Sequence, residues 1–306
     1  SSISRFPKSG CIMTETKKLR NKSFSVGGKI VKYFILSLAA LTILIPFYVI
    51  VITAFKASHA VATHIPFIWF PKFDELSFRA FGNLFTTYTI STGKSMVLTG
   101  IINTFIIVIP NTVVGMISSS VSAYAFAKLK FKGKNLMFAL LLFTMMLPGI
   151  VMLIPSYILF DALYLTDTYF PLMAPAMFGS AACVFFLRQF FSGIPDEVID
   201  AAKLDGLSYP GIYWKIMLPL SLPAVFAQAI LGFVAGYNDY LAPLIYLTSP
   251  EKYTLQIALQ FFSGSTLKDL PTVMAGAVLA LLPTTLIYVF AQKYFVEGIA
   301  ITGLKG

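Results

Sequence analysis

The sequence predicts an all-α integral membrane protein with six transmembrane helices, and two observations support that fold class. First, 57% of the 306 residues are hydrophobic and only 12% are charged, with a mean hydropathy of +0.80; soluble domains are about 45–50% apolar and about 25% charged. Second, the apolar residues form six continuous blocks, each long enough for a membrane-spanning helix of about 20 residues. The blocks lack the two-residue alternation of transmembrane β-strands, so helices are expected.

Each block is predicted to be one helix, because the bilayer offers no water to an open backbone. The six predicted helices cover residues 30–55, 97–126, 135–160, 169–190, 222–247 and 272–296. They divide the chain into a tail (1–29), a first helix (30–55), an outer segment (56–96), a transmembrane core (97–296) with a polar loop (191–221), and a second tail (297–306). Residues 1–12 precede the first methionine, Met13, and their origin is left open.

Lysine and arginine are distributed unevenly between the two sides of the predicted bundle. Seventeen of the 23 fall on the side of both termini and the 191–221 loop, including eight in residues 1–32. Because positive residues favour the cytoplasmic side, we expect both termini and this loop in the cytoplasm and the protein in the cytoplasmic membrane. The net charge of +10 is then explained by orientation and by anionic lipid, without a nucleic acid partner.

The polar loop contains the stretch "SGIPDEVIDAAKLDG", which is typical of a short helix. Pro195 suits a first helical position, and Gly206 suits a left-handed cap that ends the helix. A second short helix is expected over 208–217, with Pro219 ending it. Val198, Ala201, Ala202 and Asp205 share one side of the first helix at helical spacing, and the alanines would let another protein approach closely. The alternative is an amphipathic helix that rests on lipid.

This loop resembles the EAA motif of permease subunits in binding-protein-dependent ABC importers. The motif reads E-A-A, three residues, Gly, nine residues, I-x-L-P, and the spacing here agrees at every position. The one difference is an aspartate where the motif has glutamate, which keeps the charge on a shorter side chain. The matching residues are Asp200, Ala201, Ala202, Gly206, Ile216, Leu218 and Pro219.

Other segments are similar to the carbohydrate-uptake permeases of the MalG type. They are "FPKFDELSFRAFGNLF", "AYAFAKLKFKGK", "YNDYLAPLIYL" and the ending "YFVEGIAITGLKG", which together span about residues 30–306. The resemblance implies the MetI-like fold of type I ABC importers. It also implies as partners a homologous second permease, two ATP-binding subunits, an extracytoplasmic solute-binding protein and a sugar substrate. ATP and Mg²⁺ would bind the ATPase subunits, and this chain would bind no cofactor.

The resemblance also assigns roles to residues. Asp200 would support the loop through polar contacts, Ala201 and Ala202 would pack in a cleft of the ATPase, and Gly206 would make the bend. The loop would then be a coupling helix that moves with the ATPase dimer. The C-terminal residues Gly303, Lys305 and Gly306 resemble a tail that reaches into that dimer.

The sequence offers no catalytic site of its own, so we expect a transporter subunit and no enzyme. "STGKSMV" ends like a phosphate-binding loop, but such a loop needs glycine where Tyr88 stands. His59 and His64 have no partner cluster and predict no metal site. Cys11 and Cys183 are expected on the cytoplasmic side and within a helix, which argues against a disulfide.

Polar residues inside the predicted helices are candidates for the substrate pathway. Asp239 is expected just past the middle of the fifth helix, where it should face the bundle interior. With Tyr237, Asn238 and Tyr240 it would suit either sugar contact or hydrogen bonding between helices; Asn103, Asn111 and Gln228 are weaker candidates. Transport of another small solute is an alternative function, as is ion-coupled secondary transport, although the inverted repeat common among such carriers is not seen.

Overall fold

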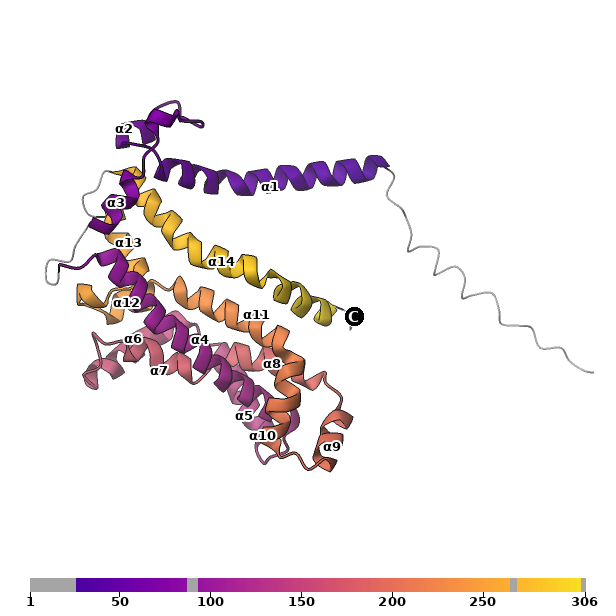
Figure 1. The fold of residues 1–306 in the computed structure, drawn as a ribbon. Coiled ribbons are helices and arrows are strands. Elements are labelled where there is room, and N and C mark those ends of the chain that lie inside the picture. The colour runs from indigo at the N-terminus through magenta and orange to yellow at the C-terminus, as the bar shows by residue number, and fades with distance from the viewer. Residues whose placement is uncertain (1–25, 87–92, 265–268, 304–306) are drawn as a thin grey trace, which may run out of the picture. The chain divides into compact units, whose positions relative to one another are not determined.

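The computed structural model describes residues 26–86, 93–264 and 269–303, and within these ranges the regular elements are helices (Figure 1). Lys56 and Leu76 form an isolated antiparallel bridge. The chain separates into two compact units, Ser1–Val49 and Ile50–Gly306. Most of the first helix, α1 (Val26–Ala54), lies in the first unit and contains Pro46. Its 29 residues would extend about 44 Å, which is enough to cross a bilayer with some tilt.

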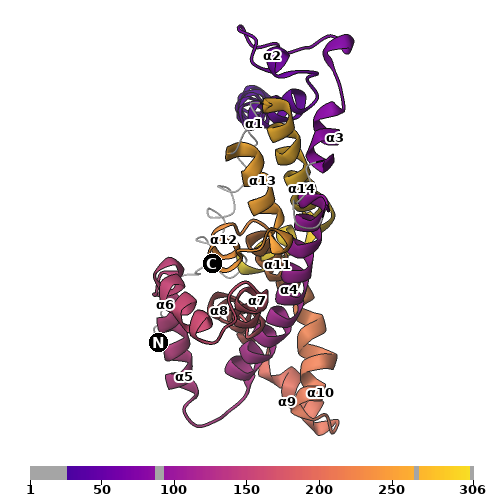
Figure 2. The same cartoon turned by 90° about the vertical axis from the view of Figure 1, so that its left-hand side faces the viewer.

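The second unit begins with short outer elements that lead to a long central helix. These are α2 (His59–Ala62), η1 (Phe73–Glu75) and α3 (Arg79–Thr86). The central helix, α4 (Met96–Lys128), starts at Ser95, whose hydroxyl accepts a hydrogen bond from the Leu98 amide. Helices α7, α8, α11 and α13 all pack on α4. The two views place α2 and α9 at opposite ends of this unit (Figures 1 and 2).

The remaining helices are mostly shorter pieces joined by breaks, except for the long last helix, α14. They are α5 (Lys134–Met145), α6 (Gly149–Ala162), α7 (Phe170–Met177), α8 (Ala181–Ser192), α11 (Leu218–Tyr237), α12 (Leu241–Tyr246), α13 (Leu255–Gly264) and α14 (Leu270–Gly303), with η3 (Pro250–Lys252) before α13. Five segments of the described chain are long and apolar enough to cross a membrane, or six if the bent pair α5–α6 is one span. The predicted all-helical fold class is confirmed. The predicted number of six membrane helices agrees with the structure if α5 and α6 are counted together as one span.

The third predicted helix is not continuous, which corrects the single helix expected over 135–160. Helices α5 and α6 meet at a bend of 98°. Pro148 stands at the bend with an extended backbone and is the N-cap of α6. Proline has no N–H to donate and disfavours helical backbone in the residue before it, which explains the break at this point.

The fifth predicted helix begins earlier and ends earlier than expected. α10 (Tyr209–Ile212) runs through a π-helical turn, η2 (Tyr213–Met217), directly into α11. The second loop helix is thus the first part of a membrane helix, and Pro219 does not end it. A wide π turn relieves the clash between a proline ring and the carbonyl four residues earlier, so the helix continues. At its other end, α11 stops at Tyr237, and Asn238–Tyr240 separate it from α12.

Three clusters of buried side chains lie in the second unit, the smallest formed by Ala54, Ala80 and Ala275. Of the other two, the larger cluster lies where α4, α8, α9, α10 and α11 meet, and its fully buried members include Leu187, Phe191, Ile212 and Met217. The smaller cluster contains Leu84, Val97, Val108, Tyr237 and Leu255. The larger cluster therefore anchors the segment that contains the EAA-like residues.

Candidate coupling helix and membrane cavity

The EAA-like segment forms a separate short helix, α9 (Asp196–Leu204), whose start is fastened to α4. The Lys128 ammonium, at the end of α4, donates to the Ile194 carbonyl at 2.6 Å and pairs with the Asp196 carboxylate at 2.5 Å. This hydrogen bond from Lys128 holds the pKa of the exposed Asp196 carboxyl below its ordinary value. Asp196 and Glu197 lie in the first turn of α9, where the positive end of the helix dipole stabilises negative charge.

The end of α9 is the glycine cap that the sequence predicted. Gly206 has a φ of +80°, the left-handed conformation that glycine adopts without strain. The Gly206 amide donates to the Lys203 carbonyl at 2.9 Å, and the Leu207 amide donates to the Ala202 carbonyl at 3.0 Å. These two bonds are the Schellman arrangement, which ends a helix and turns the chain sharply. The bend expected at Gly206 is present.

The two alanines of the motif face in different directions. Ala202 is 3% exposed and packs with Ile199 in the larger core cluster. Ala201 is exposed, as are Val198 and Leu204. Ala202 is thus buried against its own chain, which does not fit the expectation that both alanines pack in a partner's cleft; of the two, only Ala201 has its side chain at the surface.

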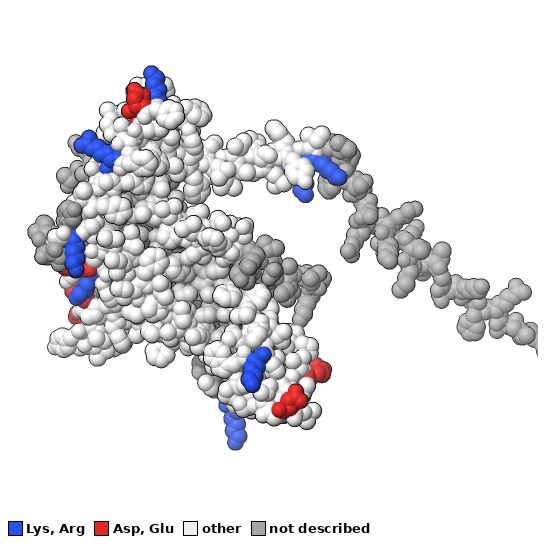
Figure 3. Space-filling view, viewed as in Figure 1, with Lys and Arg blue, Asp and Glu red and all other residues white. Residues whose placement is uncertain are grey.

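The polar residues of α9 lie on its outer surface. The Asp200 carboxylate accepts a hydrogen bond from Lys203 one turn later at 3.0 Å, and this bond raises the pKa of Lys203. Figure 3 shows charged side chains over this end of the second unit and again around α2 and the outer loops, with uncharged surface between them. A charged, exposed helix at one end of an apolar bundle suits contact with an aqueous partner.

The segment after α9 is fixed to the bundle by hydrogen bonds from α4. The Tyr213 and Ser120 hydroxyls are 2.6 Å apart, and the Tyr124 hydroxyl donates to the Tyr209 carbonyl at 3.2 Å. The other motif residues, Ile216 and Leu218, pack against the larger core cluster, and Pro219 is exposed. A push on α9 would therefore move α4 and α11 directly.

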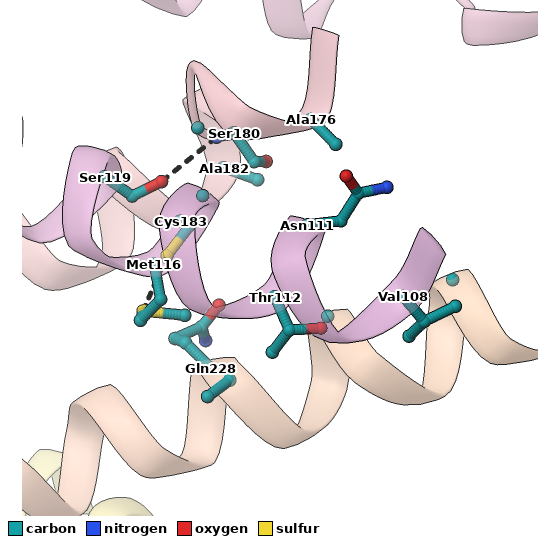
Figure 4. A pocket seen from close by; sticks show the side chains of 15 residues that line it. Val108, Asn111, Thr112, Met116, Ser119, Ala176, Ser180, Ala182, Cys183 and Gln228 are labelled. Atoms are coloured by element: carbon teal, nitrogen blue, oxygen red, sulfur yellow. Dashed lines mark hydrogen bonds between the residues drawn. The ribbon is translucent and has the colours of Figure 1, made fainter. Parts of the chain in front are cut away.

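A cavity of about 390 Å³ lies within the bundle between α4, α8 and α11 (Figure 4). Most of its lining is small, with Gly115, Gly232, Gly236 and several alanines. Its polar side chains include Asn111, Thr112 and Ser119 from α4, Ser180 beside α8, and Gln228 from α11. Gln228 extends from α11 toward α4 in Figure 4. The membrane part of the chain thus contains a pocket with amide and hydroxyl groups.

One wall of this cavity depends on close contact between α4 and the break between α7 and α8. A Cβ at Gly115 would lie 2.5 Å from the Ala176 carbonyl oxygen, and Gly179 has a φ of +91°. The Ser118 hydroxyl donates to the Phe178 carbonyl at 2.9 Å, and the Ser119 hydroxyl accepts from the Ser180 amide at 3.1 Å. Small residues let the backbones approach, and the serines bond the backbone freed by the break.

A second, smaller cavity of about 160 Å³ adjoins the first, and Asp239 lines it. The two cavities share Val108, Asn111, Ala176 and Gly236 in their linings. Asp239 lies in the break after α11, which corrects its expected place inside a helix, and its carboxylate accepts from the Ala242 amide at 3.3 Å. The break at Asn238–Tyr240 leaves backbone groups that this side chain helps to satisfy.

The other candidates for the substrate pathway have different surroundings. Tyr237 is 1% exposed and stacks on Phe233 in the smaller core cluster. The Asn238 side chain donates to the Val234 carbonyl of its own helix, and Tyr240 precedes α12. Neither cavity described above includes these three in its lining. Asn103 donates to the Glu251 and Tyr253 carbonyls, which makes it a link between helices.

The C-terminal candidates fall at the edge of what the structure describes. Gly303 is the last residue of α14, and Lys305 and Gly306 lie outside the described residues. Among the described residues, His59 and His64 included, no group of three or more His, Cys, Asp or Glu side chains could hold a metal ion. His59 instead accepts from the Leu270 amide at 3.3 Å.

Comparison with known proteins decides the family. The family model described as "Binding-protein-dependent transport system inner membrane component" matches residues 115–301, which include α9, the break after α11 and most of the larger cavity's lining. The chain belongs to this family. It is a permease subunit of the carbohydrate ABC importer type, as the EAA-like motif and the other MalG-like segments together predicted.

The permease resembles curated relatives over most of its length. It is 36% identical over 223 residues to the arabinooligosaccharides transport system permease protein AraQ of Bacillus subtilis, covering 72% of this chain and 79% of the relative. Protein LplC of Bacillus subtilis is 31% identical over 289 residues, covering 89% and 92%.

A solved structure shares the fold of the permease. It is a chain of a bacterial ABC transporter involved in the import of the acidic polysaccharide alginate, with a TM-score of 0.76 and 24% identity. The match covers 90% of this chain and 100% of the other. The predicted MetI-like permease fold is confirmed.

Proposed function

We propose that this permease carries a sugar or oligosaccharide across the cytoplasmic membrane by alternating access, and that α9 receives the driving motion from separate ATPase subunits. The observation that carries the proposal is the construction of α9. It is a charged, exposed helix that presents Ala201. Lys128 of α4 bonds the Ile194 carbonyl just before its start, and Tyr124 of α4 bonds the Tyr209 carbonyl in the segment that follows it. A motor outside the membrane needs a contact of this kind.

The construction of α9 favours transmission of force over a flexible tether. Ile199 and Ala202 seat the helix in the core, Lys128 fixes its start and the Gly206 cap fixes its end. Since packed cores are stiff, a displacement of α9 reaches α4 and α11 with little loss. Those two helices line the larger cavity, so a single movement at the cytoplasmic end could change access to it.

The partners follow from the family and from the unequal lysine distribution. The positive-inside rule puts both termini and α9 in the cytoplasm, where ATPase subunits carry ATP and Mg²⁺. A homologous second permease would complete the pathway, and an extracytoplasmic solute-binding protein would deliver the sugar. The name of the relative AraQ supports an oligosaccharide as cargo. We propose that the tail residues Gly303, Lys305 and Gly306 also contact the ATPase subunits.

The test is ATP-driven uptake by the purified assembly in vesicles. We expect the permease to co-purify with a second permease and an ATPase, and the vesicles to import a labelled oligosaccharide only with ATP and the binding protein. Ala201→Trp should remove uptake because its bulk separates α9 from the ATPase, whereas Ala201→Ser should retain it. Uptake driven by an ion gradient without an ATPase would overturn the proposal in favour of secondary transport.

A further inference from the structure

We propose that the cavity between α4, α8 and α11 is a binding site for one unit of an uncharged sugar, with Asn111 and Gln228 as its hydrogen-bonding residues. This inference rests on the proposed function and adds to it a site in this chain and a class of cargo. The cavity, of about 390 Å³, falls in the range of about 300–1,000 Å³ typical of small-molecule sites.

Asn111 supplies the first indication of a ligand. Its amide nitrogen donates to the Leu172 carbonyl at 2.9 Å, which fixes the side chain between α4 and α7. Its amide oxygen is buried and has no hydrogen-bond partner in the described chain. A buried acceptor without a partner is unfavourable, and such a group calls for an explanation. A sugar hydroxyl that donates to this oxygen would provide one.

Gln228 supplies a second, independent group on the facing helix. Its side chain points from α11 toward α4 into the cavity (Figure 4), and it makes no hydrogen bond to any described residue. An amide both donates and accepts, as a hydroxyl does, so the two match in either orientation. A polar side chain inside a membrane bundle is usually bonded to a neighbouring helix, and this one is not.

The rest of the lining suits the ring of a sugar. Gly115, Gly232, Gly236 and Ala229 leave flat apolar surface for ring C–H groups, while Thr112 adds a hydroxyl. The smaller cavity shares Asn111 and is also lined by Asp239. A sugar that passes from the smaller cavity to the larger would therefore meet a carboxyl group, then Asn111 and then Gln228.

The charges of the lining select the class of sugar. Among the described residues that line the two cavities there is no lysine, arginine or histidine, and Asp239 is the only acidic one. An acidic sugar would bring a carboxylate into a low-polarity site without a cation to pair with it, which is strongly unfavourable. A neutral sugar meets no such penalty, and its hydroxyls can donate to Asp239.

Equilibrium binding to the purified assembly tests the site directly. Labelled arabinotriose serves as the neutral probe and trigalacturonate as the acidic one, both without the solute-binding protein. Gln228→Leu should weaken arabinotriose binding about fivefold to tenfold, the effect of one lost hydrogen bond. Trigalacturonate should bind at least tenfold more weakly than arabinotriose to the wild-type assembly. Gln292→Leu is the matched control, because Gln292 is an exposed amide that bonds the Val289 carbonyl of its own helix; its binding should equal that of the wild type.

A folding defect can be separated from a binding defect. Gln228 bonds no side chain or backbone group among the described residues, so Gln228→Leu should leave the thermal stability unchanged. Asn111→Leu, which also loses the bond to Leu172, is the supporting variant. If the wild type imports sugar with ATP but both variants bind arabinotriose as tightly as it does, the cavity is only a packing void and the site proposal fails. If the wild type imports no sugar with ATP, the proposed function fails and this site falls with it.

Discussion

Helix α9 and the cavity between α4, α8 and α11 both depend on small residues, but they use them in opposite ways. In the cavity wall, Gly115 and Gly179 bring helices of the same chain so close that a side chain would collide with the neighbouring backbone or with Ser119. On α9, Ala201 leaves open surface that a second protein can approach, while Ala202 one residue later is buried. In both regions a small residue permits close approach of another backbone. Tertiary packing decides whether that backbone belongs to the same chain, as at Gly115, or can belong to another protein, as at Ala201.

The largest effect is expected where the approach is internal. Gly115→Leu would force α4 away from Ala176, whose carbonyl oxygen lies 2.5 Å from the added Cβ. Overpacking of this kind is destabilising by about 3 kcal/mol. Thermal unfolding of the full-length permease in detergent would show it as a lower midpoint. Gly82→Leu is the control, because nothing lies within 4 Å of a Cβ at that position; equal stability of the two variants would refute the close contact.

A smaller effect separates the two alanines of α9. Ala202→Leu inserts three carbons into the core cluster around Ile199 and should destabilise the fold by about 1–3 kcal/mol. Ala201→Leu lies on exposed surface and should change stability by no more than about 0.5 kcal/mol. The same unfolding measurement compares them. A larger loss at Ala201 than at Ala202 would reverse the assignment of inner and outer faces.

A further effect concerns the loops around Asp167 and Lys252, which are joined by an ion pair. Asp167, with a φ of +53°, accepts from the Thr248 and Ser249 amides at 2.9 Å and pairs with Lys252 at 2.8 Å. Burial alone would raise the pKa of the Asp167 carboxyl, but hydrogen bonds from Lys252, Ser249 and Thr248 outweigh it and hold the pKa well below its ordinary value. Asp167→Asn tolerates the same backbone and removes the charge, so it should lower stability by about 1 kcal/mol.

The pH dependence of that effect has a definite sign. Because the folded-state pKa is lowered, the contribution of Asp167 is fully present above its unfolded pKa of about 3.9 and is lost as the pH falls through the folded value. The stability difference between wild type and Asp167→Asn should therefore be constant from about pH 8 to pH 5 and shrink only below about pH 4. A difference that disappears between pH 7 and pH 5 would contradict the ion pair.

Much of the fold could be predicted because the signals are local. Long apolar blocks mark the membrane helices, and Gly206 marks a helix end by its conformational freedom. The helix breaks are harder to predict from sequence, because membrane helices often contain proline without breaking. Pro148 breaks its helix, whereas Pro219 follows a π turn and does not. The sequence predicts Asp239 inside a helix because "GYNDYLAP" has apolar stretches on both sides, and nothing in its composition indicates that α11 stops at Tyr237.

The candidate site was only partly accessible to sequence reasoning. The EAA-like spacing locates α9, but it does not show which of Ala201 and Ala202 is buried, because that depends on the cluster that Ala202 joins with residues of α4, α8 and α11. Asn111 and Gln228 were weak candidates because polar residues in membrane helices usually bond neighbouring helices. Their significance depends on an unpartnered oxygen and on a cavity that forms only after α4 and α11 pack together.

The most direct test of the account is cross-linking from α9 in the working assembly. With Cys11 and Cys183 replaced by serine, Ala201→Cys should form an adduct with the ATPase subunit through a short bifunctional thiol reagent, and Ala202→Cys should not, because it is buried. The account predicts this adduct in an assembly that imports sugar with ATP. Full ATP-driven uptake without any adduct at position 201, or labelling of that cysteine from outside the cell, would contradict it.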